Sequence, residues 1–255
     1  MSRHAARGPA VEMAVADGVA WLTLARPARR NLLDDEMMGT LVEASQAVEH
    51  DEQVRVVVLS AAGEHFCGGL PVGIAWPPAS WPDGVAAVAG VTKPVIACLA
   101  GTVRGWGLAL ALACDLRVAA ATAVLELPET LRGRLPGGGA TQRLPRLIGS
   151  SRALFMLLLG EPVSADTAAA WGLVSRVVAP RRLRSTAGAL ARDLVARGPL
   201  ALRLAKEAVG RALDLPLDDG VRLEHDLYVL LQTTSDRREG VRSFLERRPP
   251  RYEGR

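Results

Sequence analysis

Two short segments of this chain consist almost entirely of apolar, largely β-branched side chains: residues 54–60 (VRVVVLS) and 94–99 (PVIACL). Continuous apolar runs of this length are typical of strands buried on both faces, as in a parallel sheet. Three further short segments, 116–119, 123–127 and 174–179, are also predicted to be strands. Helical patterns separate these segments at spacings that suit β–α crossovers, so the sequence predicts an α/β core.

The flanking segments complete the predicted organisation. Residues 11–24 predict a hairpin that turns at Asp17-Gly18, and Asp34, Asp35 and Glu36 predict the start of a helix. From about residue 181 onward the pattern is helical, and a last short helix is predicted to open at Ser235. We therefore expect a core with the functional site in residues 1–195 and a helical section in residues 196–255. The amphipathic helices of that section need partner surface, so we expect it to form an oligomer.

Composition excludes several classes of protein. The chain has 255 residues, and its three cysteines form no C-x-x-C pattern, which disfavours a disulfide framework and a zinc site. No apolar run approaches the roughly 20 residues of a membrane span. The first nine residues contain no apolar stretch, so we expect no signal peptide and a reducing cytoplasm.

The net charge is concentrated at one end of the chain. Lysine and arginine exceed aspartate and glutamate by 31 to 27, a net charge of +4. Residues 237–255 contain seven arginines and three glutamates, so this tail carries the whole excess. A basic tail can bind phosphates, a partner subunit or nucleic acid, or it can simply be a solvated helix end.

Two segments share the pattern of a buried strand, a glycine-rich turn and a helix. One runs through residues 56–70 and the other through residues 94–108. Glycine permits close backbone approach to a ligand, and a helix start leaves backbone N–H groups unpaired. Two such turns meeting at the carboxyl ends of strands would form a two-donor hole for an oxygen that gains charge. The alternative is that these glycines merely form turns at strand ends.

Five sequence motifs occur in order along nearly the whole chain. They are residues 26–33 (RPARRNLL), 63–70 (GEHFCGGL), 93–119 (from KPVIA to CDLRVA), 127–144 (LPE followed by PGGGATQRL) and 235–255. Through these boxes the chain resembles a known family, the enoyl-CoA hydratase/isomerase or crotonase superfamily. Single boxes are weakly specific, whereas five in order are very specific.

The resemblance implies a crotonase-like spiral of ββα units with a C-terminal helical section that builds trimers, often dimers of trimers. It implies an acyl-CoA thioester as substrate, with coenzyme A as part of that substrate and no metal or further cofactor. The family holds a thioester enolate with two backbone N–H groups, which fall here on Leu70 and Trp106. Glu129 matches a family acid/base. The substrate is also expected to contact the following residues: Arg29, Cys67, Gly68, Leu70, Pro71, Gly105 and Trp106.

Two departures from the family pattern affect the predicted reaction. The hydratase pattern uses two glutamates around a water molecule, and the second falls here on Ala109, which cannot transfer a proton. The segment from Pro71 to Thr92 is shorter than usual and rich in proline and tryptophan. This segment normally lines the acyl pocket, so the shape of the substrate does not carry over.

Several other residues have side chains that could serve catalysis or substrate binding. Glu126 precedes Glu129 by three positions and could assist it, but on a strand it is expected to point the other way. Asp115 is expected to be structural, and His65 lacks partners for a triad. Cys67 could be a nucleophile, although a packed small residue fits its position better. Three tryptophans could form an acyl pocket: Trp76, Trp81 and Trp106. The other two, Trp21 and Trp171, are expected in the core.

Three classes of function follow from these observations. The first and favoured one is an isomerase that converts 3-enoyl-CoA to 2-enoyl-CoA with Glu129 as its single acid/base. The second is other thioester chemistry, such as hydration with a substitute acid, another lyase reaction or decarboxylation. The third is a non-catalytic binder of acyl-CoA or RNA, although nucleic acid is not the expected partner. Glu129 argues against a pure binder, which has no need of a carboxylate there.

Overall fold

The computed structural model describes residues 8–74 and 76–255, so the expectation about the first nine residues lies largely outside the described part. The strands are β1 (Val11–Ala16), β2 (Val19–Leu24), β3 (Val56–Ala61), β4 (Val95–Leu99), β5 (Thr102–Arg104), β6 (Leu116–Ala120), β7 (Val124–Glu126), β8 (Val163–Ser164) and β9 (Arg176–Val178). The helices are α1 (Asp35–His50), α2 (Gly84–Gly90), α3 (Trp106–Leu112), α4 (Ala140–Ile148), α5 (Ser150–Leu159), α6 (Ala165–Ala170), α7 (Leu183–Val195), α8 (Pro199–Arg211), α9 (Leu217–Gln232) and α10 (Ser235–Leu245). Three short 3-10 helices are η1 (Pro27–Arg29), η2 (Thr130–Arg132) and η3 (Pro180–Arg182).

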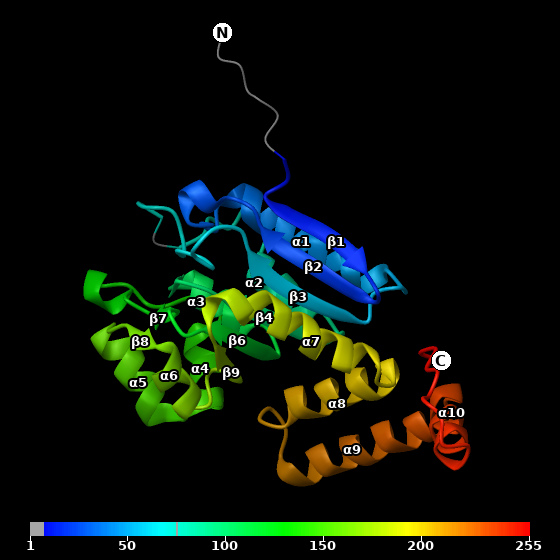
Figure 1. Ribbon diagram of the computed structural model, residues 1–255. Helices are drawn as coiled ribbons and strands as arrows, with labels where there is room; N and C mark the ends of the chain where they lie inside the picture. The colour runs from blue at the N-terminus through cyan, green and yellow to red at the C-terminus, as the bar shows by residue number, and fades with distance from the viewer. Residues whose placement is uncertain (1–7, 75) are drawn as a thin grey trace.

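Two sheets organise the core. The larger has the strand order β1-β2-β3-β4-β6-β9, and every neighbouring pair except β1 and β2 is parallel. The smaller has the order β5-β7-β8. Successive strands alternate between the sheets: β4 leads to β5 and α3, and β6 leads to β7 and α4. The chain thus winds as a spiral of ββα units, which confirms the predicted fold class (Figure 1).

The apolar runs behave as buried parallel strands. Along β3, Val57 and Leu59 face one core cluster while Val56 and Val58 face another, and all four are at most 1% exposed. The first cluster includes residues of α1, α2 and α3, whereas α7 packs on the second, across β2, β3, β4 and β6. Strands covered on both faces need apolar side chains at every position, which is why these segments lack polar alternation.

Local sequence signals account for the first elements. The β1–β2 hairpin turns through Asp17 and Gly18, both with positive φ, as the Asp-Gly pair predicts. Asp34 is the N-cap of α1, and its carboxylate accepts a hydrogen bond from the Met37 amide at 3.0 Å. Asp35 and Glu36 then place negative charge at the positive end of the helix dipole.

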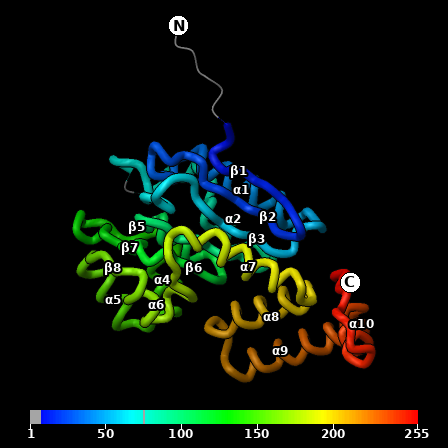
Figure 2. Tube along the Cα trace, viewed as in Figure 1, coloured from blue at the N-terminus to red at the C-terminus, as the bar shows by residue number. Residues whose placement is uncertain are grey.

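The C-terminal helices α8, α9 and α10 extend away from the two sheets (Figure 2). The change from core to helical section falls between the end of α7 at Val195 and the start of α8 at Pro199. Lys206 of α8 ties this section to the core through Asp115 at 2.7 Å, and Arg55 binds the Tyr252 carbonyl at 2.6 Å. Many apolar side chains of these helices are exposed, including Leu217 at 82% and Phe244 at 81%.

Candidate active site

A cavity of about 840 Å³ lies where the two glycine turns meet the segment around Glu129. Its walls come from the η1 region, the turn after β3, the β5–α3 junction and the segment from Glu126 to Arg134. Of the residues expected to contact substrate, the structure brings these to one cavity: Arg29, Gly68, Leu70, Pro71, Gly105, Trp106 and Glu129.

Cys67 is the exception among the expected residues. Its side chain is fully buried and does not line the cavity, because its backbone bridges to Val103 and its sulfur packs against Gly107 on the inner side. Burial raises the pKa of the Cys67 thiol to about 12, so the reactive thiolate is disfavoured. Cys67 is therefore a packing residue behind the cavity.

Close packing of the two turns places the amides of Leu70 and Trp106 at the cavity. Gly69 has φ +91°, and a Cβ there would lie 2.9 Å from the Arg104 carbonyl oxygen and 3.7 Å from the Trp106 nitrogen. Only glycine permits this approach. Trp106 is the first residue of α3, so its N–H has no intrahelical acceptor. Within the described residues, neither amide has a hydrogen-bond acceptor, which leaves two donors for an oxygen of the substrate.

The expectation that both turns lead directly into helices is wrong for the first. After Leu70 the chain is irregular, and α2 begins only at Gly84. Pro71, Pro77, Pro78 and Pro82 lie in between, and proline in a helix interior removes a hydrogen bond and clashes with the preceding turn. The Leu70 amide is instead held by its neighbours: the Leu33 amide donates to the Gly69 carbonyl at 2.9 Å.

Asn31 is a positioning residue that the sequence analysis did not single out. It is fully buried with φ +50°, and its amide nitrogen donates to the carbonyls of Ala62 at 3.1 Å and His65 at 2.9 Å. Its amide oxygen accepts from the Arg26 N–H at 2.9 Å. Asn31 thereby joins the η1 segment to the first glycine turn. Its place in the RPxxxN box was the available signal.

Glu129 supplies the carboxylate of the cavity. It follows β7 through Pro128 and precedes η2, and its Oε1 packs against the α-carbon region of Gly105, directly before the Trp106 amide. Its Oε2 is buried without a hydrogen-bond partner in the described structure. Burial raises the pKa of Glu129, and the charge of Glu126 adds to this, while its own backbone amide and Arg104 act in the opposite direction.

This environment predicts a pH dependence for any reaction in which Glu129 removes a proton. Only the carboxylate form accepts a proton, and the pKa of Glu129 lies above its usual 4.5. We therefore expect kcat/KM to rise with pH through that raised pKa and then to level off. A pH–rate profile of the wild type measures this, and a rate that falls as pH rises from 5 to 7 would contradict it.

The position of Ala109 is closed off from the cavity. Its side chain is fully buried, and a Cβ on Gly138 would lie 2.8 Å from the Ala109 Cβ and 3.1 Å from Cε3 of Trp106. Gly137 likewise packs on the Trp106 indole, with 2.5 Å between its Cβ position and Cζ2. Gly138 thus packs against both Ala109 and the Trp106 indole, and the indole fills the space beside the two glycines. No carboxylate approaches Glu129 from this side among the described residues.

Glu126 lies differently from its expected orientation. It lines the same cavity as Glu129, 3.5 Å from Nη1 of Arg104, its register partner on β5. The expectation of opposite sides assumed one continuous strand through both glutamates. β7 in fact ends at Glu126, and Glu129 already has helical dihedral angles, so strand alternation does not extend to it.

The remaining candidates are structural. Asp115 accepts hydrogen bonds from the Val95 amide and from Lys206, both at 2.7 Å. The Nδ1 of His65 accepts from the Thr102 amide at 3.1 Å, which holds the second turn in place. Neither side chain lines the cavity.

The tryptophans divide differently from the expectation. Trp106 lines the cavity. Trp76 packs edge-on against the Trp106 ring, with 5.4 Å between the ring centroids, but the Trp76 side chain is 60% exposed. Trp81 does not line the cavity. Trp21 and Trp171 are half-buried and pack against the two core clusters, and Arg184 and Arg152, respectively, lie over their rings. The indole of Trp106 therefore forms the aromatic part of the cavity wall.

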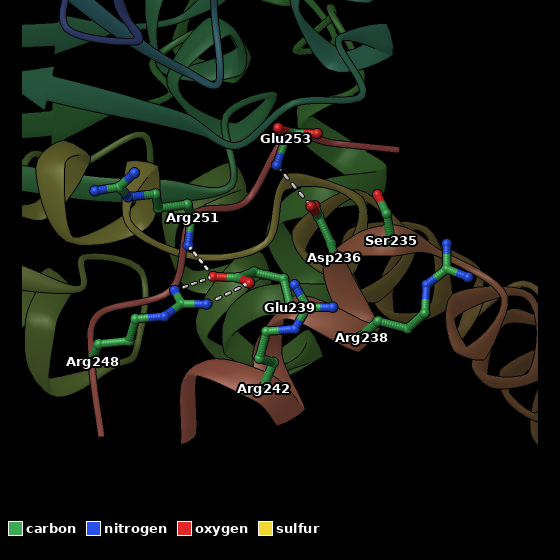
Figure 3. Close-up of a pocket in the computed structure, with 8 residues that line it drawn as sticks. All are labelled: Ser235, Asp236, Arg238, Glu239, Arg242, Arg248, Arg251 and Glu253. Carbon is green, nitrogen blue, oxygen red and sulfur yellow. Dashed lines mark hydrogen bonds and ion pairs between the residues drawn. The ribbon is translucent and has the colours of Figure 1, made fainter. Parts of the chain in front are cut away.

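A second hollow, of about 760 Å³, lies between α10 and the C-terminal segment (Figure 3). Glu239 accepts hydrogen bonds from Arg248 at 2.6 and 2.9 Å and from the Arg251 amide at 2.9 Å. These bonds, that of Arg248 foremost, lower the pKa of Glu239 to about 2. Asp236 binds the amide of Glu253 at 2.7 Å. The acidic residues of α10 therefore hold the arginine-rich tail in place.

No group of three or more His, Cys, Asp or Glu side chains suited to a metal ion occurs in the described residues. None of the helices there is long and apolar enough to cross a membrane.

Comparisons with known proteins place this geometry in context. The family pattern described as "Enoyl-CoA hydratase/isomerase" matches residues 14–255. The chain belongs to the enoyl-CoA hydratase/isomerase family. It is 39% identical over 253 residues to (E)-benzylidenesuccinyl-CoA hydratase of Thauera aromatica, covering 96% of this chain and 99% of the relative. It is 36% identical to 1,2-epoxyphenylacetyl-CoA isomerase of Escherichia coli, covering 94% and 97%.

Solved structures of enoyl-CoA hydratase/isomerase family members agree with the fold. An enoyl-CoA hydratase subunit from Geobacillus kaustophilus superposes with a TM-score of 0.90 at 39% identity, covering 96% of this chain and 98% of that chain. An enoyl-CoA hydratase from Mycobacterium tuberculosis gives 0.91 at 30% identity, covering 97% and 100%. The chain is thus a crotonase-fold member of a family of enzymes that act on acyl-CoA.

Proposed function

We propose that this enzyme isomerises 3-enoyl-CoA to 2-enoyl-CoA with Glu129 as its single acid/base. The observation that carries the proposal is the asymmetry of the cavity. A buried, unpartnered carboxylate oxygen of Glu129 shares the cavity with two free amides, while Ala109 is fully buried against Gly138. Isomerisation needs one proton-transferring group, which Glu129 supplies. The position of Ala109, where the hydratase pattern has a second glutamate, supplies none.

The reaction assigns a step to each group. The carboxylate of Glu129 takes a proton from C2 of the 3-enoyl thioester, and the electron pair moves to the thioester oxygen. The amides of Leu70 and Trp106 donate to that oxygen while the dienolate exists. Glu129 then returns the proton to C4, which leaves the double bond between C2 and C3. The carboxylate ends as it began, so no second acid is consumed.

Hydration of 2-enoyl-CoA is the second candidate, because Glu126 lines the same cavity. In that reaction Glu126 would take a proton from a water molecule while the water oxygen bonds to C3. Glu129 would then protonate C2. Side-by-side rates distinguish the two. We expect isomerisation of a 3-enoyl-CoA to exceed hydration of the matching 2-enoyl-CoA, and the reverse ratio would favour hydration.

We also propose that the enzyme assembles as a trimer or hexamer through the C-terminal helices. Their exposed apolar side chains include Val209, Leu213, Leu217, Phe244 and Leu245, each at least 65% exposed. Removing apolar surface from water is worth about 25 cal/mol per Å², and this gain opposes the entropy lost on association. Light scattering is expected to give three or six times 27.0 kDa. The variant Phe244→Glu is expected to shift this mass toward the monomer, and a monomeric wild type at micromolar concentration would contradict the proposal.

We also propose that the tail of one subunit helps to bind the phosphates of the CoA that a neighbouring subunit holds. Among the described residues, none beyond Arg134 lines the cavity, so we assign the tail to the site of a neighbouring subunit. Glu239 engages the guanidinium of Arg248 but only the backbone amide of Arg251, which leaves the guanidinium groups of Arg238, Arg242 and Arg251 in the same hollow as the phosphate ligands. We expect the double variant Arg238→Gln/Arg242→Gln to weaken CoA binding several-fold, more at low salt than at high salt. The control variant Arg222→Gln on α9 should leave CoA binding unchanged. Equal Kd values for CoA in the control and in the double variant would refute the role of the tail in phosphate binding.

A further inference from the structure

The cavity holds more cationic groups than its own carboxylates balance. Five arginines line the cavity: Arg29 and Arg30 of the η1 region, Arg104 from β5, Arg132 from η2, and Arg134 shortly after η2. The carboxylates that line it are Glu126 and Glu129. An excess of positive charge therefore faces the reacting end of the substrate.

Strand geometry brings Arg104 into this space. Alternation along β5 buries Val103 completely and turns Thr102 and Arg104 toward the cavity. Arg104 precedes the oxyanion donor Trp106 by two residues. The phosphates of CoA are separated from the thioester by the whole pantetheine arm. A group that Arg104 can reach therefore belongs to the acyl side of the substrate.

The donors of Arg104 are not used up within the protein. Its Nη1 lies 3.5 Å from Oε1 of Glu126, longer than the 2.7–2.9 Å of a charge-assisted hydrogen bond. Its side chain makes no hydrogen bond within the described residues. Arg117, by contrast, donates to the carbonyls of Leu173 and Cys114 at 2.7 Å each, and Arg248 bonds Glu239 at 2.6 Å. Arg104 thus keeps most of its N–H groups available.

A neutral acyl chain would fit this wall poorly. A substrate that fills the cavity excludes water from Arg104, and burying a charge is costly unless it is paired and hydrogen-bonded. An anionic group on the acyl chain would accept the hydrogen bonds that Glu126, at 3.5 Å, does not take, and a carboxylate matches the planar fork of a guanidinium. Leu70, Ile74 and Trp106 also line the cavity and suit the apolar part of such a chain.

We propose that Arg104 binds a carboxylate on the acyl portion of the substrate, so that the preferred substrate is a CoA half-thioester of a dicarboxylic acid. Glu126 orients the guanidinium from the neighbouring strand. This proposal rests on the proposed function for the identity of the thioester, but it concerns binding and can be tested without turnover.

The test measures Kd by calorimetry for two saturated acyl-CoAs, a half-thioester with a free terminal carboxylate and its methyl ester. Since a hydrogen bond to a charged group contributes about 1.5–3 kcal/mol, the wild type is expected to bind the carboxylate at least ~10-fold more tightly. In Arg104→Leu/Glu126→Leu, which removes both charges together, this preference is expected to disappear. Arg132→Leu, on the same cavity wall, is the matched control and should keep most of the preference.

Two further arms decide the source of the anion. The same ligand pair is measured as pantetheine thioesters, which lack the nucleotide phosphates, and the preference for the carboxylate should persist there. Thermal unfolding establishes that each variant folds. Equal Kd values for acid and ester in the wild type, a preference that survives the double variant, or one that vanishes with pantetheine would each overturn the proposal. A confirmed preference without isomerisation would instead reject the proposed reaction alone.

Discussion

Replacing Glu129 by glutamine is expected to lower the isomerisation rate by about 10²–10⁴-fold, the usual contribution of a general base. Glutamine keeps the shape of the side chain but cannot accept the proton from C2. The measurement is kcat for a 3-enoyl-CoA, together with the Kd for a saturated acyl-CoA, which is expected to stay near its wild-type value.

The same variant has an expected effect on stability, which separates lost chemistry from lost folding. A raised pKa means that the fold favours the protonated carboxyl, and this stabilisation is lost as pH rises through the raised value. At neutral pH the buried charge destabilises the protein, so Glu129→Gln should unfold at the same or a higher temperature there. The advantage should vanish near pH 4. Full activity in Glu129→Gln would refute the assigned role, and Glu126 would be the next carboxylate to replace.

Replacing Gly105 by alanine is expected to lower activity by roughly 10²–10³-fold, comparable to the loss of an oxyanion donor. Gly105 has φ 53° and ψ −122°, a conformation that costs other residues about 1–3 kcal/mol. A Cβ at this position would also collide with Oε1 of Glu129. The substitution therefore disturbs the base and the Trp106 amide together. Steady-state kinetics with a 3-enoyl-CoA measures the effect.

Gly133→Ala is the matched control for this variant. Gly133 also has positive φ, 65°, but a Cβ there would meet no atom within 4 Å. It carries the backbone cost without the collision, so it should lose stability but little activity. If both variants lost activity equally, backbone strain rather than the packing of Gly105 against Glu129 would explain the result.

The fold was largely predictable because its signals are local. The apolar runs of β3 and β4, the Asp17-Gly18 turn and the cap at Asp34 each act within a few residues of the chain. The two glycine turns at the cavity were predictable for a similar reason, since strand–glycine patterns mark them.

The less predictable features of the site depend on contacts between distant segments. The Trp106 indole packs against Gly137 and Gly138, and Gly138 also packs on Ala109, yet no local pattern links these positions. Glu126 and Glu129 both line the cavity because β7 ends at Glu126. The alternation of side chains along a strand therefore does not extend to Glu129. The helix expected after Leu70 is absent because four prolines occupy the segment before α2, which the composition of that segment already indicated.

The most direct test of the central claim, that Glu129 alone moves a proton while two amides hold the enolate, is proton exchange in heavy water. The wild type is incubated with a 3-enoyl-CoA, and deuterium at C2 and C4 is followed by mass spectrometry together with product formation. We predict 2-enoyl-CoA as the main product, deuterium incorporation that depends on Glu129, and little 3-hydroxyacyl-CoA. Rapid formation of 3-hydroxyacyl-CoA, or exchange that is undiminished in Glu129→Gln, would contradict the account.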